Sequence, residues 1–406
     1  MKRTNTGYIS SIITGILILC AFSCKTKPVF LLSEDKEWAA SALQTAEQQY
    51  RFLAKETPAG RFPKTLENGK LITSSSDWWC SGFYPGTLFY LYKASGEKFF
   101  LQEAEKKLAV LEKEKNNKTT HDLGFMMFCS FGNAYKITRQ SQYAAVIDTS
   151  SQSLISRFSP VTGTIRSWDP APWNSKWKYP VIIDNMMNLE MLLWAADHFK
   201  NQEFRAVALK HAETTLKNHF RSDFSSYHVV SYDPETGRVE MKNTDQGYAD
   251  ESAWARGQSW GLYGYTVMYR FTKKPEFLKQ AQGIADFILN NPNLPADKIP
   301  YWDFNDPAIP GAKRDASAGA VMASALLELK NYVPKSKSET YAKAAEIMLK
   351  TLSSPQYLAR NGENGGFILR HGVGNMPDKT EVDVPLSYGD YYYVEALLRY
   401  LGKSLD

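Results

Sequence analysis

Two kinds of helical segment alternate along most of the chain. Segments of the first kind carry an aromatic residue followed four positions later by an apolar one, and their opposite face is rich in Lys, Glu and Gln. These aromatic positions are Phe100, Tyr143, Phe204, Phe277 and Tyr341. The spacing predicts amphipathic helices with one buried face, so we expect the five aromatic rings to lie in the core.

Segments of the second kind are apolar around most of their circumference, which is typical of helices that are buried on several sides. They run from Pro85 to Ala94, Asp122 to Ile137, Asp184 to Phe199, Glu251 to Phe271, Ala316 to Val333 and Tyr391 to Leu401. A first helix at roughly Glu34 to Lys55 brings the total to about twelve, with six amphipathic helices alternating with six buried ones. This alternation predicts an all-α fold, an (α/α)6 barrel.

One segment has the pattern of β-structure. Residues 227–232 and 238–241 are rich in β-formers, and the turn residues Asp233 to Gly237 separate them, which predicts one short β-hairpin insertion. No linker divides the body of the chain, so residues 34–406 are expected to form a single domain.

The N-terminus has the features of an export signal. Lys2 and Arg3 precede an apolar run from Ile9 to Phe22, and the residues before Cys24 resemble a bacterial lipobox. A retained membrane anchor is the alternative, but about 14 apolar residues are fewer than the roughly 20 that span a bilayer. We expect residues 1–23 to be removed, Cys24 to carry lipid, and residues 24–33 to tether a periplasmic protein to the membrane through that lipid only.

Composition excludes several classes of function. The 48 Lys and Arg nearly balance the 43 Asp and Glu, and basic residues form no run of the kind that binds nucleic acid. Cys80 and Cys129, the cysteines of the mature body, are expected to be free. No Cys, His or carboxylate spacing suggests metal ligands, so neither metal nor cofactor is expected. The sequence is silent on oligomeric state.

The alternation of helices also predicts where chemistry gathers. Inner helices separated by outer ones all run in the same direction, so their N-termini share one end of the barrel. The segments that enter them hold most of the unusual polar and aromatic residues, and the chain contains 10 Trp, 23 Tyr and 21 Phe. We expect a site for a sugar ring at this end, lined by Trp79, Trp168, Trp254, Trp260, Trp302 and Tyr388.

Two aspartates open inner helices at this end. Asp122 and Asp184 are each placed to cap a helix N-terminus, which is the ordinary role of such a residue. Their convergence with His121 and Arg256 on one aromatic rim favours catalysis instead. Arg256, early in a buried helix, would pair with the carboxylate of an acidic sugar or stack on an aromatic ring.

At these residues the chain resembles the unsaturated glucuronyl hydrolases, a family of glycoside hydrolases. The most specific motifs are His121-Asp-Leu-Gly-Phe, Asp184-Asn-Met-Met-Asn and Trp254-Ala-Arg-Gly-Gln-Ser-Trp. The resemblance implies that Asp184 is the general acid and base and that Asp122 is its catalytic partner. It also implies a substrate-binding role for His228, Gln246, Trp254 and Arg256, and less specifically for Trp79, His121, Trp168 and Trp260.

The family's substrates are oligosaccharides that polysaccharide lyases leave with a 4,5-unsaturated uronic acid at the non-reducing end. Cleavage begins by hydration of that double bond, which implies that Asp184 protonates C4 and then takes a proton from the water that adds at C5. One carboxyl group in both roles needs a raised pKa, and we expect repulsion from Asp122 to supply it.

Two alternatives stay open. The related unsaturated rhamnogalacturonyl hydrolases act on pectin fragments, although the His121-Asp122 pair argues against them. The second alternative is a non-catalytic sugar-binding lipoprotein. If the chain is an unsaturated glucuronyl hydrolase, Gly372 and Gly374 stand where members that accept sulfated glycosaminoglycan disaccharides tend to carry serines and a lysine. This difference puts a sulfated substrate in doubt without excluding it, because the nearby cations Arg370 and Lys379 could take over the role of the lysine.

Overall fold

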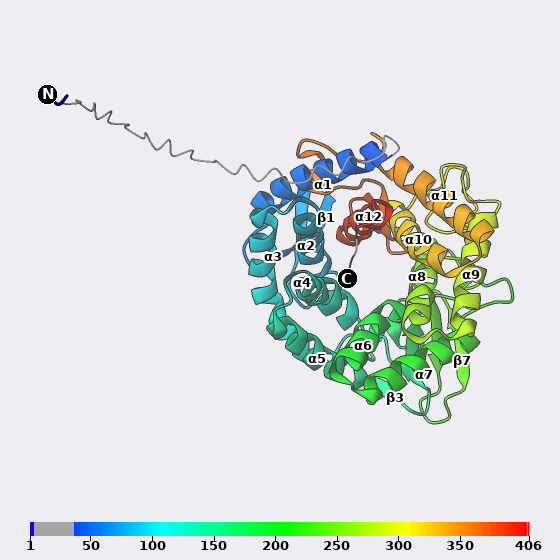
Figure 1. Cartoon of the computed structure of the whole chain (residues 1–406). Helices are drawn as coiled ribbons and strands as arrows, with labels where there is room; N and C mark the ends of the chain where they lie inside the picture. Colours follow the sequence, from blue (N-terminus) through cyan, green and yellow to red (C-terminus); the bar gives the residue numbers. More distant parts are fainter. Residues whose placement is uncertain (4–35, 404, 406) are drawn as a thin grey trace.

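The helices form a closed double ring in a computed structural model that describes residues 1–3, 36–403 and 405 (Figure 1). The outer ring consists of α1 (Glu37–Glu56), α3 (Lys98–Leu111), α5 (Ser141–Ile155), α7 (Gln202–Asn218), α9 (Pro275–Asn290) and α11 (Lys335–Leu352). The five aromatic residues predicted to lie in the core are at most 7% exposed. The (α/α)6 barrel is therefore confirmed.

The inner ring alternates with the outer one along the chain. It consists of α2 (Phe83–Ser95), a π-helix η3 (Gly124–Gly132) that continues as α4 (Asn133–Thr138), α6 (Asn185–Phe199), α8 (Ala255–Thr272), α10 (Ala316–Leu329) and α12 (Ser387–Tyr400). Of these helices, α8 begins later than the sequence predicts and α12 begins earlier. Trp254 makes an isolated β-bridge with Asp303, so α8 starts only at Ala255, and α12 starts at Ser387 because its polar first turn is also buried.

The sequence predicted one β-hairpin, but the described residues form four small sheets, so this prediction is wrong. The predicted hairpin exists as β6 (Val229–Tyr232) and β7 (Val239–Asn243), but β5 (Pro180–Ile182) joins it as a third strand. The other sheets are two-stranded: β1 (Phe62–Glu67) with β2 (Lys70–Ser74), β3 (Phe158–Ser159) with β4 (Thr164–Ile165), and β8 (Gly372–Asn375) with β9 (Thr380–Val384). These strands are short and lack a clear alternation of polar and apolar residues.

The N-terminal predictions fall largely outside the described residues, because Cys24 and the whole apolar run lie within residues 4–35. Among the helices that the structure describes, none combines the length and the hydropathy of a membrane span. Cys80 and Cys129 are both free thiols, as expected. No cluster of His, Cys, Asp or Glu in the described part is arranged to hold a metal ion.

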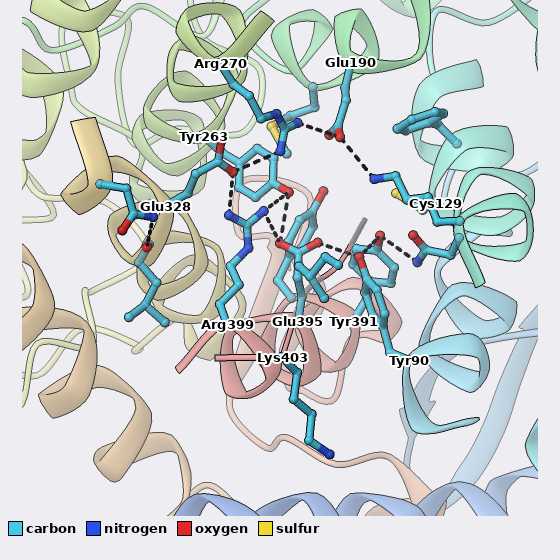
Figure 2. A pocket seen from close by; sticks show the side chains of 18 of the residues that line it. Tyr90, Cys129, Glu190, Tyr263, Arg270, Glu328, Tyr391, Glu395, Arg399 and Lys403 are labelled. Carbon is cyan, nitrogen blue, oxygen red and sulfur yellow. Dashed lines mark hydrogen bonds and ion pairs between the residues drawn. The ribbon is translucent and has the colours of Figure 1, made fainter. Parts of the chain in front are cut away.

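The C-terminal ends of the inner helices surround a cavity of about 450 Å³ (Figure 2). Charged side chains point toward one another across it. Arg270 Nη2 lies 2.6 Å from Glu190 Oε1, and Arg270 Nη1 lies 3.1 Å from Glu328 Oε2. Arg399 also pairs with Glu328 and lies 3.4 Å from Glu395. This network ties four inner helices together: α6, α8, α10 and α12.

Glu328 receives both guanidinium groups of this network. Burial alone would raise the pKa of its carboxyl group, but Arg270 and Arg399 outweigh burial and lower the pKa to about 2. A pKa below that of the unfolded chain means that the contribution to stability is present above about pH 4.5. The contribution is lost as the pH falls toward 2 and the carboxylate takes up a proton.

We therefore predict that Glu328→Gln lowers the free energy of unfolding by about 3 kcal/mol at neutral pH, because two partly buried cations lose the anion that they share and each keeps one other carboxylate. Denaturant unfolding at pH 7 and at pH 3 measures this effect. The difference between wild type and variant should shrink at pH 3. An equal difference at both pH values would contradict the assignment of the stabilisation to the ionised carboxylate.

A candidate active site at the N-terminal ends of the inner helices

The three-stranded sheet places Asp184 beside His228. Ile182 of β5 pairs with Val229 of β6 in antiparallel register, and the Ile183 amide donates to the His228 carbonyl at 3.0 Å. Ile183, which follows β5, and His228, which precedes β6, therefore lie side by side, and Asp184 comes next to His228. Asp184 Oδ2 lies 3.7 Å from His228 Nε2. The strand that was not foreseen is thus the element that aligns two of the predicted site residues.

A glycine brings Asp122 to the same place. A Cβ atom on Gly124 would lie 2.4 Å from the Cα of Asn188, so only glycine lets η3 approach α6 this closely. Asn188 accepts the Phe125 amide through Oδ1 at 2.9 Å, which turns its amide nitrogen toward the carboxyl group of Asp122. The motifs around Asp122 and Asp184 are therefore held against each other.

Helix capping does not explain either aspartate. Asp184 occupies the N-cap position of α6, but its side chain makes no capping hydrogen bond. Asp122 lies just before η3, whose N-terminus also lacks a side-chain cap. Asp122 instead accepts a hydrogen bond from Thr120 Oγ1 at 3.3 Å. Both carboxyl groups are left available for another role.

Burial dominates the electrostatics of Asp184. It raises the pKa of this carboxyl group to about 7, with Arg256 acting in the opposite direction and the negative charge of Asp122 adding a smaller increase. The expectation that repulsion from Asp122 is the main cause is therefore corrected. Asp184 Oδ2 is buried and accepts no hydrogen bond, so a proton on this oxygen is free to leave.

Asp122 has the same raised pKa in different surroundings. Burial raises the pKa of its carboxyl group to about 7, against hydrogen bonds from Thr120 and Asn188 and the charge of Arg157. Its other oxygen, Oδ1, lies 3.1 Å from His121 Nε2. Unlike Asp184, Asp122 thus has neighbours at both oxygens.

His228 is a buried, neutral hydrogen-bond donor, not a residue on an exposed hairpin. Burial, followed by the charge of Arg256, lowers its pKa well below 6.5. Its Nδ1 accepts the amides of Asp245 and Gln246 at 3.1 and 3.2 Å. Because a neutral imidazole has one N–H, the proton is on Nε2, the nitrogen that faces Asp184.

Both Nη atoms of Arg256 are engaged with the protein, and its ring contacts fit the expected stacking on an aromatic side chain. Its Nη1 lies 3.2 Å from Asp315 Oδ2 and also donates to the Val373 carbonyl. Its Nη2 donates to Gln246 Oε1 at 3.1 Å and to the Gly374 carbonyl. The guanidinium group lies 4.5 Å from the ring of Trp254 and 5.4 Å from that of Tyr388.

The predicted aromatic lining divides into two groups. Trp254 and Trp168 border His228, with ring centroids 4.6 and 6.1 Å away. Trp79 is partly buried against Tyr388, at 5.0 Å. Trp260 and Trp302 do not border His228 and pack in the core; at most 4% exposed, they are as buried as Trp254 and Tyr388.

Trp260 and Trp302 differ from each other in the hydrogen bonding of the indole N–H. Trp260 Nε1 has no hydrogen-bond partner, although its indole N–H lowers the pKa of Asp184. Trp302 Nε1, in contrast, donates to Asp306 at 2.5 Å. Trp260 therefore keeps a place in the site and Trp302 does not.

Sequence reasoning missed three residues that shape the site. Asn188 lies four positions after Asp184, a helical spacing that could have revealed it. Asp315 gave no local signal, since it is 59 positions from its partner Arg256. Trp173 is 60% exposed and meets Trp168 edge-on at 5.1 Å, so it extends the aromatic surface outward.

Comparisons with known proteins show what the chain is similar to. Residues 55–396 match the model of Glycosyl Hydrolase Family 88. An unsaturated glucuronyl hydrolase of Formosa agariphila is 44% identical over 84% of this chain and 85% of its own length. An unsaturated chondroitin disaccharide hydrolase of Streptococcus pyogenes is 32% identical over 92% of this chain and 93% of its own.

A solved structure, an unsaturated glucuronyl hydrolase specific for heparin, superimposes with a TM-score of 0.87 at 47% identity. The match covers 90% of this chain and 97% of that one. The similarity therefore extends over most of the chain. The chain belongs to Glycosyl Hydrolase Family 88, the unsaturated glucuronyl hydrolases, and is a glycoside hydrolase.

Proposed function

We propose that this enzyme removes the terminal 4,5-unsaturated glucuronic acid from oligosaccharides that lyases release from glycosaminoglycans, with Asp184 as general acid and base. The observation that carries the proposal is the pair of largely buried carboxyl groups, each with a side chain 14% exposed and a pKa of about 7, at the aromatic end of the barrel. A group with a pKa near the working pH is suited both to give and to take a proton.

The reaction would begin with proton transfer from Asp184 to C4 of the sugar. The vinyl ether accepts the proton at C4, and positive charge spreads over C5 and the ring oxygen. Asp184 Oδ2 is suited to this step because no protein group binds it. The Asp184 carboxylate that results then takes a proton from the water that adds at C5. The hemiketal opens, and the glycosidic bond breaks with it.

The neighbouring residues would orient this chemistry. His228 presents its Nε2–H beside Asp184, and two backbone amides hold that tautomer. Arg256 would act on Asp184 through its charge. Because its Nη donors already bind the protein, it would orient Gln246 through a hydrogen bond and Trp254 through the contact between its guanidinium group and the indole ring. Direct contact with the substrate is left to His228, to the amide group of Gln246 and to the aromatic rings.

The loop before α12 bears on which leaving sugar is accepted. Gly374 has no space for a side chain, because a Cβ atom there would lie 2.6 Å from Glu381 Cβ and Oε2. Glu381 in turn pairs with Lys64 at 3.4 Å. The similarity to a heparin-specific hydrolase favours heparin fragments as the preferred substrate.

The assay follows loss of the ultraviolet absorbance of the conjugated ene-carboxylate in fragments that lyases make from heparin, chondroitin, hyaluronan and rhamnogalacturonan. Wild type should remove the absorbance of the glycosaminoglycan fragments, and of heparin fragments fastest. Asp184→Asn should lower kcat by about 10² to 10⁴, the usual contribution of a positioned acid. Absorbance lost only from rhamnogalacturonan, or from no fragment, would contradict the proposal.

Asp390→Asn is the matched control for this variant. Burial also raises the pKa of Asp390 to about 7. Both of its oxygens, however, accept backbone amides, those of Ile368 and Leu369, at 2.9 and 2.8 Å. Asp390→Asn should lower stability and leave kcat per folded molecule near that of wild type. Comparable loss of kcat in the two variants would mean that Asp184 acts through the fold.

The partners of Arg256 generate a prediction about pH. In Asp315→Asn the guanidinium group loses its nearest buried anion, so more of its positive charge acts on Asp184. The pKa of Asp184 should fall, and the decline of kcat/KM at alkaline pH should move to lower pH. The free energy of unfolding should fall by about 3 to 5 kcal/mol. An alkaline limb that stays in place in the folded variant would contradict the link between Arg256 and Asp184.

We also propose that the enzyme is an exported lipoprotein, attached to the membrane at Cys24 and facing the periplasm. The basic N-terminus, the apolar run and the small residue before Cys24 support this. In a bacterial host, Cys24→Ser should abolish incorporation of labelled fatty acid and move the protein from the membrane fraction to the soluble one. Equal membrane recovery of the two proteins would contradict lipidation at this residue.

A further inference from the structure

The hydrogen bonds of His121 determine which of its ring nitrogens carries a proton. Its Nδ1 lies 2.8 Å from the carbonyl oxygen of Ser167. A carbonyl oxygen only accepts, so Nδ1 must donate. In the neutral ring Nε2 is then a bare lone pair, the reverse of the arrangement in His228. The two histidines of the site therefore present opposite polarities to it.

The lone pair of His121 Nε2 lies close to an oxygen of Asp122. Nε2 is 3.1 Å from Asp122 Oδ1, and with Asp122 as a carboxylate it is a buried nitrogen without a hydrogen-bond partner. Two lone pairs at this distance repel each other, so the contact requires a proton between them. The second oxygen of Asp122 accepts from Thr120 at 3.3 Å, which leaves Oδ1 as the oxygen that holds the proton.

An imidazolium facing a carboxylate would also place one proton in this contact, but the surrounding charges disfavour it. Arg157 Nη2 lies 3.2 Å from the same Ser167 carbonyl and sets a permanent positive charge behind His121. Asp184, when ionised, opposes a second anion at Asp122. Burial lowers the pKa of His121 to about 3 and raises that of Asp122 to about 7. The charge of Arg157 also favours an ionised Asp122, but burial outweighs it. The balance of these influences keeps the pair neutral.

We propose that His121 is a positioning residue that keeps Asp122 protonated: the pair shares one proton, bound to Asp122 Oδ1 and accepted by His121 Nε2. The proposal rests on the proposed function in that Asp122 is taken as the partner of Asp184. It assigns different tasks to the two aspartates. Asp122 keeps its proton through the contact with His121, and Asp184 alone has a free oxygen from which a proton reaches the substrate.

Nitrogen-15 NMR of protein labelled at histidine tests the proposal, because two-bond couplings distinguish the tautomers and the imidazolium. Between about pH 5 and 8, His121 should remain neutral with its proton on Nδ1. His211 and His219 are internal references of the other tautomer. His211 accepts the Ile165 amide at Nδ1, and His219 Nε2 lies 3.1 Å from the Val181 carbonyl. A doubly protonated His121, or one protonated on Nε2, would overturn the proposal.

Two variants sharpen the test. In Asp122→Asn the amide N–H replaces the carboxyl O–H, so the His121 tautomer should be unchanged. His121→Asn assigns the resonance, keeps a donor near the Ser167 carbonyl and removes the lone pair at Nε2. Asp122 should then ionise at lower pH, and its charge should raise the pKa of Asp184.

The kinetic readout separates this role from a structural one. In His121→Asn the alkaline limb of kcat/KM should move up by about one pH unit. A folded variant with lower kcat and an unmoved limb would overturn the proposal. The tautomer is measured without substrate, so an enzyme that fails the Asp184→Asn test can still pass this one, and the two failures are distinguishable.

Discussion

The site depends on how the buried charge of Arg256 is shared. Its guanidinium group is bound by Asp315 at the start of α10, by two carbonyls of β8 and by Gln246. These contacts hold together segments that are far apart in the chain. They also restrain the cation, which would otherwise lower the pKa of Asp184 further. The same ion pair therefore serves the geometry of the site and the protonation of its acid.

Two carboxyl groups with the same pKa have different chemical environments. Both owe the rise chiefly to burial. Asp122 has Thr120 at one oxygen and His121 at the other, whereas Asp184 Oδ2 is unpartnered. Hydrogen-bond occupancy, more than pKa, distinguishes the residue able to deliver a proton from the one that keeps it.

Much of the fold could be predicted from hydrophobic periodicity, because each helix pattern extends over several turns. The alternation of buried and amphipathic helices also placed Asp122, Asp184 and Arg256 at one end. Long-range pairing left no comparable local signal. The strand β5 is only three residues long, yet it aligns Asp184 with His228. The partner of Arg256 was likewise hidden by the 59 positions that separate it from Asp315.

The claim that Asp184 is the acid whose protonation governs catalysis can be measured directly by carbon-13 NMR. Protein labelled at the aspartate carboxyl carbon is titrated, and the Asp184 resonance is identified by its absence in Asp184→Asn. The account predicts an inflection near pH 7 that coincides with the alkaline limb of kcat/KM. An Asp184 carboxyl group that titrates near its ordinary value of about 4, while kcat/KM declines near pH 7, would contradict it.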